Sequence, residues 1–160
     1  MGFRLVSSGG DVVNPAVVNL AASGVVKVNQ LVDFLRSGTG GAVVGPTSSA
    51  STTTMVIGVS KGYAQGASDT AVDVILVTPH QLWEADCANA ATTAQVGLRH
   101  ALSASDRAVI HNSATDVSTQ TGIFLALAMT GSTSGSGKLI GIIQGYNGKL
   151  IPVTDTTFLQ

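Results

Sequence analysis

Charged side chains are scarce in this 160-residue sequence. They make up 11% of the residues, and the net charge is only −1, whereas an ordinary soluble domain has roughly 25% charged residues. Glu84 is the only glutamate. This composition excludes long solvent-exposed helices, which rely on glutamate and lysine, and it is poorly suited to a chain that stands alone in water. We infer a protein that is covered by neighbours.

Cysteines and long hydrophobic runs are also scarce. The single cysteine, Cys87, excludes an internal disulfide and fits folding in a reducing cytoplasm. No apolar run approaches the roughly 20 residues of a membrane-spanning helix. The first residues, MGFRLVSSGG, contain no apolar signal-peptide region. We therefore expect neither a membrane span nor a secretion signal.

Valine, threonine, serine and glycine dominate what is present, which favours short strands joined by tight turns. The pattern predicts about eight to ten strands in an all-β fold, a small β-barrel or sandwich with an extended N-terminal arm. Residues 101–112 are the best helix candidate, because Ser103 and Asp106 resemble a capping box. The tetrapeptide GKLI occurs at 137–140 and again at 148–151. One repeat does not indicate a solenoid, so we interpret both copies as strand starts after a glycine turn. The expected strands cover 3–6, 25–35, 42–45, 55–60, 72–78, 80–86, 122–130 and 138–145.

Residues 1–24 are predicted to form the arm, and residues 25–160 the β-rich domain. Gly9 and Gly10 loosen the middle of the arm, and Pro15 excludes a central strand. The arm's apolar side chains would be exposed in water, so we expect them to contact a neighbouring subunit by strand addition. A chain without residues 2–20 should then still fold. The predicted contact residues are Phe3, Leu5, Val6, Val12, Val13, Val17 and Val18.

The stretch TGSTSGSGKLIG, at 130–141, resembles a phosphate-binding loop. That motif needs a glycine where Ser132 stands, a hydroxyl residue where Leu139 stands, and a helix after the lysine. All three requirements fail. We therefore interpret the stretch as a hairpin loop and expect no nucleotide or other cofactor.

GVSKG, at 58–62, matches the G-x-S-x-G pattern of a nucleophilic serine, here Ser60. That serine must sit on a sharp turn from a strand into a helix, and no helix pattern follows. Asp69, Asp73 and the three histidines His80, His100 and His111 could complete a triad only on paper. We keep an esterase as a third hypothesis and expect that the protein is not an enzyme.

Two further clusters contain side chains that can bind ligands. His80, Glu84, Asp86 and Cys87 lie close together in the sequence, but no second cluster at metal-ligand spacing supports them, so we expect no metal site. Arg99, His100, Arg107 and His111 form the only basic cluster, and Asp106 dilutes it. The dense basic patch of a nucleic-acid-binding protein is missing. We interpret Trp83, Tyr63 and Tyr146 as core or interface residues.

Several segments together resemble the small capsid decoration, or cement, proteins of tailed bacteriophages. They are VVKVNQLVDF, MVIGVSKGYAQGASDTAVDVILVTP, LWEADCANAATTAQVG and GIFLALAMTGSTSGSGKLIGII, which cover most of the chain. The resemblance implies a β-rich domain without an active site, located on the outer capsid surface after synthesis in the host cytoplasm. It also implies a homo-oligomer, commonly a trimer, that clamps neighbouring subunits of the major capsid protein.

We therefore expect a structural virion protein that stabilises contacts between major capsid subunits. The alternative is a fibre-type or carbohydrate-binding β-module of the virion, because β-sandwiches with polar loops often bind sugars. Copy number separates the two, since a cement protein is abundant in the particle and a fibre module is rare.

Overall fold

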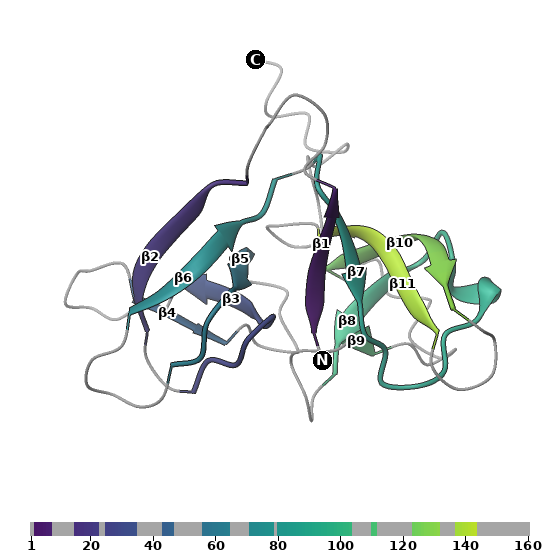
Figure 1. Cartoon of the computed structure of the whole chain (residues 1–160). Coiled ribbons are helices and arrows are strands. Elements are labelled where there is room, and N and C mark those ends of the chain that lie inside the picture. Colours follow the sequence, from purple (N-terminus) through teal and green to yellow (C-terminus); the bar gives the residue numbers. More distant parts are fainter. Residues whose placement is uncertain are drawn as a thin grey trace, which may run out of the picture.

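The computed structural model confirms an all-β protein (Figure 1). It describes residues 2–7, 15–22, 25–34, 43–46, 56–64, 71–78, 80–103, 110–111, 123–131 and 137–143. These residues form eleven strands and one short 3-10 helix, η1. The elements are β1 (Phe3–Ser7), β2 (Val17–Ala22), β3 (Leu31–Phe34), β4 (Val43–Pro46), β5 (Val56–Ser60), β6 (Ala71–Leu76), β7 (Leu82–Ala85), η1 (Thr93–Gln95), β8 (Arg99–Leu102), β9 (Ile110–His111), β10 (Phe124–Thr130) and β11 (Lys138–Ile143).

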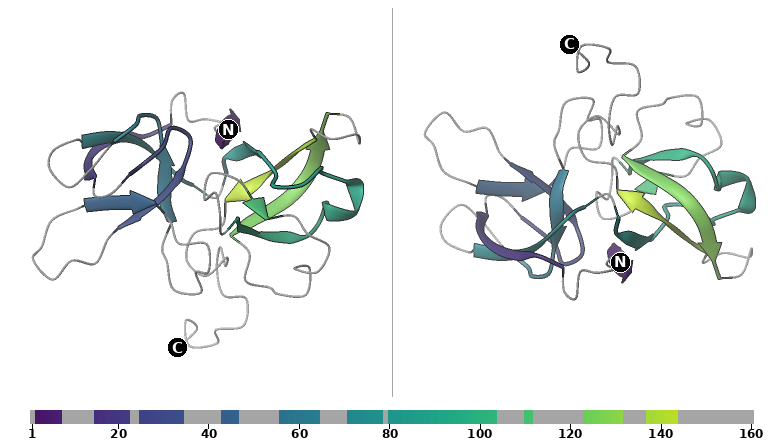
Figure 2. Two further views of the ribbon diagram at one scale, coloured as in Figure 1. Left: turned by 90° about the horizontal axis from the view of Figure 1, so that it is seen from below. Right: turned by 90° about the horizontal axis from the view of Figure 1, so that it is seen from above.

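The strands form two groups that lie side by side (Figure 2). The first is a closed five-stranded barrel in the order β2-β4-β3-β5-β6. The second is a six-stranded sheet in the order β1-β7-β11-β10-β8-β9. Its last strand curls back to the residues after β7, where Ile110 donates a hydrogen bond to Asp86 O and accepts one from Ala88 N, both at 2.9 Å. These two bonds close β7, β11, β10, β8 and β9 into a second ring.

The two rings have the same topology. In the first, β2 pairs in parallel with β4, and the other four contacts are antiparallel. In the second, Cys87, just after β7, forms a parallel bridge with Ile110, and the other four contacts are again antiparallel. Following the chain, β2 to β6 therefore correspond one by one to β7 to β11.

The register and backbone details of the two rings also agree. Leu20 pairs with Val72 in the first ring, and Ala85 pairs with Leu139 in the second. Before β3, Asn29 N donates to Ser60 O, while before β8, Gly97 N donates to Ala126 O, both at 2.8 Å. Asn29 and Gly97 both have positive φ angles, 62° and 85°.

Corresponding residues of the two rings are 65 to 68 positions apart in the sequence. Ala22 and Cys87 have the smallest separation, and Asn29 and Gly97 have the largest. The chain is thus a tandem pair of equivalent barrels. The sequence analysis did not identify this repeat.

The core has two parts. Inside the first barrel lie the alternate, inward-facing residues of its strands, among them Val32, Val72 and Val74. The larger cluster fills the second barrel around Trp83 and Phe124 and continues onto the outer face of the first barrel, where Leu31 and Val59 pack. Because one apolar cluster spans both barrels, each barrel buries part of the other.

The structure corrects the prediction that residues 1–24 form an arm outside the β-rich domain. β1 pairs with β7, and β2 pairs with both β6 and β4, so the described parts of residues 1–24 belong to the folded unit. A chain without residues 2–20 would lose β1 and most of β2, and we now expect it not to fold. The two strands pair with strands of their own chain, whereas the prediction was addition to a neighbouring subunit.

Two other expectations were wrong. Residues 101–112 do not form a helix where the structure describes them, because β8 and β9 pair as antiparallel strands with Leu102 opposite Ile110. Within 25–35, only 31–34 is a strand, since the positive φ of Asn29 turns the chain just before it. The strands expected at 55–60 and 72–78 pair antiparallel, and the hairpin expected around 130–141 is confirmed by the pairing of β10 with β11. The second GKLI copy and the turn at 147–148 lie outside the described residues.

β1 connects the two barrels (Figure 1). Phe3 N donates a hydrogen bond to Asn29 O of the first barrel at 2.8 Å, and Asp86 N of the second barrel donates to Gly2 O at 3.2 Å. The Phe3 ring is 1% exposed and lies 5.9 Å from the Phe124 ring, tilted by 60°. Gly2 allows this close approach, because its φ is 139° and an added Cβ would lie 2.3 Å from Asn29 O.

We expect Gly2→Ala to destabilise the protein. The backbone conformation alone should cost about 1–3 kcal/mol, and the clash with Asn29 adds to it. Gly97→Ala is the matched control, because Gly97 also has a positive φ but a Cβ there meets no atom within 4 Å. Urea unfolding of both variants measures the difference. Equal losses of unfolding free energy would contradict the role given to the close approach of β1.

Candidate functional site

The phosphate-loop candidate joins two antiparallel strands, β10 and β11, rather than a strand and a helix. Its lysine, Lys138, already has two carboxylate partners. Lys138 Nζ lies 3.0 Å from Glu84 Oε1 and 3.2 Å from Asp86 Oδ1. A lysine held in this way does not extend toward a phosphate, and the hairpin interpretation is confirmed for the described residues.

Ser60 is a structural residue. It is fully buried at the end of β5, where its hydroxyl donates to Lys27 O and accepts a hydrogen bond of 3.1 Å from Gln30 N. In the second barrel, the carbonyl that corresponds to Lys27 O is Gln95 O, which lies 3.0 Å from His100 Nε2. Ser60 and His100 thus hold the same turn in the two barrels. Asp73, another triad candidate, accepts a hydrogen bond from Asn19 instead.

The remaining candidate ligands do not assemble either. Among the described residues, no three His, Cys, Asp or Glu side chains could hold a metal ion together. His80 is exposed, whereas Glu84 and Asp86 share one face, as their alternation predicted. In the basic cluster, His100 is buried and Arg99 half-buried, and Arg107 lies outside the described residues. No helix that the structure describes could cross a membrane.

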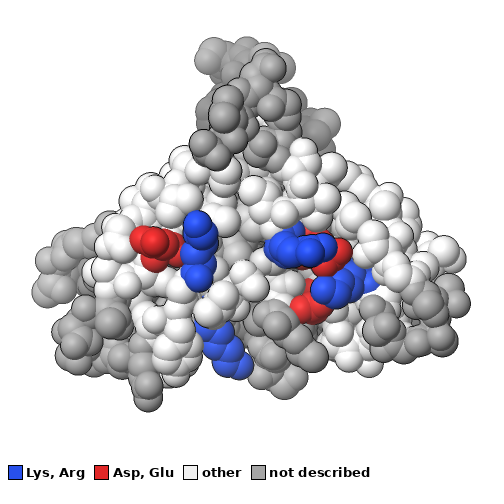
Figure 3. Space-filling model, viewed as in Figure 1, with Lys and Arg blue, Asp and Glu red and all other residues white. Residues whose placement is uncertain are grey.

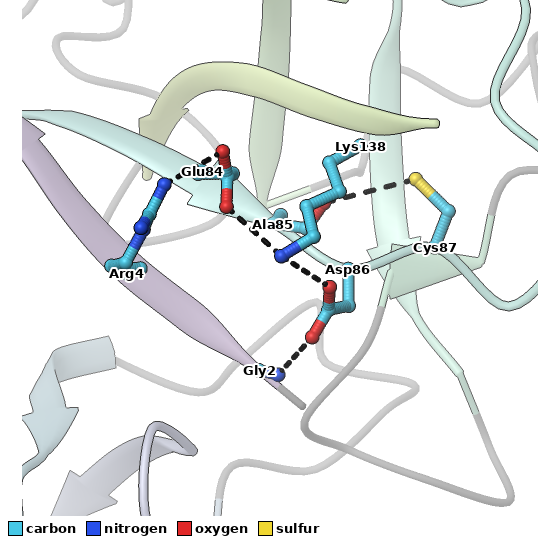
Figure 4. A network of polar contacts seen from close by, with 7 residues as sticks. All are labelled: Gly2, Arg4, Glu84, Ala85, Asp86, Cys87 and Lys138. Carbon is cyan, nitrogen blue, oxygen red and sulfur yellow. Dashed lines mark hydrogen bonds and ion pairs between the residues drawn. The ribbon is translucent and has the colours of Figure 1, made fainter. Parts of the chain in front are cut away.

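A charge network on β1, β7 and β11 was not predicted as such (Figure 4). Glu84, with a side chain only 10% exposed, lies 3.0 Å from Arg4 and 3.0 Å from Lys138. Asp86 accepts a 2.6 Å hydrogen bond from Gly2 N. The hydrogen bonds from Lys138 to Glu84 and Asp86 raise the pKa of Lys138 above its usual value. The network fixes β1 onto β7, and the sequence signal for it was the only glutamate, on an alternating strand.

Cys87 follows this strand, and its thiol is partly buried. Burial raises its pKa from the usual 9.0 to about 11, and the nearby Asp86 carboxylate adds to the rise. The thiol is therefore neutral near pH 7, whereas a thiolate is the nucleophile and metal ligand. Its sulfur lies 3.9 Å from Ala85 O.

Of the seven predicted contact residues, three are exposed. Val6 is 47% exposed on β1, and Val17 and Val18 are 43% and 37% exposed on β2. Phe3 is in the core, so it is not available to a neighbour. Leu5 packs against the same core cluster. Val12 and Val13 lie outside the described residues.

The charges on the face that contains β1, β2, β6 and β7 gather in a few groups on a mainly uncharged surface (Figure 3). One group is the network around Glu84, in which acidic and basic side chains compensate one another. Exposed apolar side chains that the sequence analysis did not single out include Val25, Val28 and Leu127, and Tyr63, interpreted there as a core or interface residue, is also exposed.

The comparisons with known proteins give no family. No protein-family model matches this sequence, and no curated protein matches it significantly.

We expect Ser60→Ala to reduce stability. The substitution leaves Lys27 O and Gln30 N without their buried hydroxyl partner, which should cost about 1–3 kcal/mol. Urea unfolding monitored by circular dichroism measures the loss, with Thr93→Ala on the exposed surface as control. Unchanged stability, or labelling of Ser60 by a fluorophosphonate probe, would contradict the structural role.

Stability should also fall at alkaline pH. The pKa of Cys87 is higher in the folded chain, at about 11, than the usual 9.0, so its contribution is complete below pH 9 and is lost as the pH rises through 11. The raised pKa of Lys138 acts in the same direction. Urea midpoints measured across this range should therefore decline, and Cys87→Ala should decline less. An identical decline in the variant would rule out the thiol as a cause.

Proposed function

We propose that the protein is a structural virion protein that binds the outside of a phage capsid and stabilises contacts between major capsid subunits. The observation that carries the proposal is the exposure of Val6, Val17 and Val18 on the two N-terminal strands. The described charges on the face drawn in Figure 3 gather in a few groups, and a mainly uncharged surface has the character of a contact surface rather than of a free one.

The side chains that would support other functions have structural roles instead. Lys138 is held by two carboxylates, Ser60 holds a turn, and Cys87 is neutral. The resemblance to decoration proteins of tailed bacteriophages agrees with this reading and supplies the partner, the major capsid protein, and a trimeric state. A small contact repeated over a lattice suits such a chain, because many weak attachments act together.

The test uses capsid shells from which the protein has been removed. The purified chain should pellet with the shells and raise their resistance to heat. Val6→Asp should weaken binding roughly tenfold, because a buried valine is worth about 1.5 kcal/mol. Thr93→Asp is the control, since Thr93 is exposed and polar.

Copy number gives an independent measurement. Quantitative mass spectrometry of purified particles should find the chain in numbers comparable to the major capsid protein. A chain that does not bind shells, or that is present in only a few copies, would overturn the proposal and favour a fibre module.

A further inference from the structure

The equivalence of the two barrels gives β2 and β7 corresponding edges. In β7, Glu84 and Asp86 direct their backbone groups away from β11 and toward β1, as the bond from Asp86 N to Gly2 O shows. In β2, the bond from Leu76 N to Ala16 O directs the even-numbered residues toward β6. The backbone groups of Val17 and Asn19 therefore point the other way, since successive residues of a strand alternate.

Within the part of the chain that the structure describes, this edge of β2 is open, whereas β1 covers the edge of β7. Among the described residues, β4 pairs only with Ala21 and Ala22, and no strand pairs with Val17 or Asn19 on that side. Both residues are exposed. Natural proteins usually protect such an edge with a lysine, a bulge or a covering segment, and β2, with the sequence VVNLAA, has no charge.

The lack of charge on this edge of β2 indicates which kind of strand can pair with it. On β7, the partner β1 is a different strand, and the contact carries opposite charges, Arg4 and Glu84. The residue of β2 that corresponds to Glu84 is Asn19, which is neutral and whose amide donates to Asp73 at 2.7 Å. Two identical edges can pair only if they do not repel each other, and a neutral edge meets this condition.

We propose that β2 pairs with β2 of a second copy of this chain, antiparallel about a twofold axis through Val18. Val17 then lies opposite Asn19 of the partner, and each exchanges two backbone hydrogen bonds with the other. Val18 lies opposite the same residue of the partner, in a pair without backbone hydrogen bonds, and the two exposed side chains cover each other. The arrangement is self-complementary, as a twofold contact must be.

The contact is small. A stable dimer usually buries more than about 1,000 Å², and a pair of short strand edges buries less. The free chain should therefore dimerise only weakly, with a dissociation constant on the order of 0.1 mM. It becomes effective where copies are already concentrated, for example between neighbouring oligomers on one surface. The twofold β2–β2 contact differs from the threefold contact within a trimer, so it would join one trimer to the next.

A cysteine trap tests the geometry. In antiparallel pairs without backbone hydrogen bonds, opposite Cα atoms are about 4.5 Å apart, which is within the range of a disulfide. In a Cys87→Ala background, Val18→Cys should therefore form a covalent dimer on mild oxidation. Val17→Cys is the matched control, because it is equally exposed but lies opposite Asn19. We expect dimer formation at least roughly tenfold faster for Val18→Cys.

Hydrogen exchange provides a second measurement on the unaltered chain. The amides of Val17 and Asn19 should become protected as the chain concentration rises, in parallel with dimer formation in analytical ultracentrifugation. Val17→Pro removes one of the donors at the edge and should abolish both effects, whereas Val17→Thr should retain them. Equal trapping of both cysteine variants would overturn the proposal. Protection that appears only when capsid shells are added would also overturn it, by assigning the edge to another partner.

Discussion

The placement of β1 is the constraint on which the rest of the structure depends. One edge of this strand is hydrogen-bonded to β7, and its first residues reach the Asn29 turn of the other barrel. Phe3 fills the apolar cluster that both barrels share. Burial of one large side chain is worth about 1.5–3 kcal/mol, but here the same side chain also keeps two barrels in one relative position. The charge network around Glu84 and the close approach at Gly2 both secure this strand.

Duplication of one barrel explains why corresponding positions use different residues for the same purpose. The turn before the second strand of each barrel needs a positive φ, and asparagine serves in one and glycine in the other. The carbonyl in that turn is satisfied by Ser60 in one barrel and by His100 in the other. What the two barrels share is therefore hydrogen-bond geometry, and the surfaces are free to differ. Among the described residues, the edge of β7 is charged and covered by β1, whereas the edge of β2 is neutral and open.

The sequence predicted what depends on local pattern. Short apolar runs located β5, β6, β10 and β11, and the alternation around Glu84 placed it on one face with Asp86. The duplication of the barrel was missed because the two copies agree in strand pairing and register, and no short stretch of sequence shows these. The helix expected at 101–112 was wrong because a local capping signal was outweighed by strand pairing. The arm looked independent because the partner of β1 is distant in the chain.

That distance has a consequence for how the chain is made. Arg4 and its partner Glu84 are 80 residues apart, and contacts of such long range slow folding. During synthesis, β1 leaves the ribosome before its partner β7, which follows only after the residues between them have been added. Until then Phe3 and its neighbours lack their native cover, and the nascent chain carries an unprotected apolar strand. Early encounters between nascent chains, rather than the stability of the finished fold, should therefore limit the yield of soluble protein.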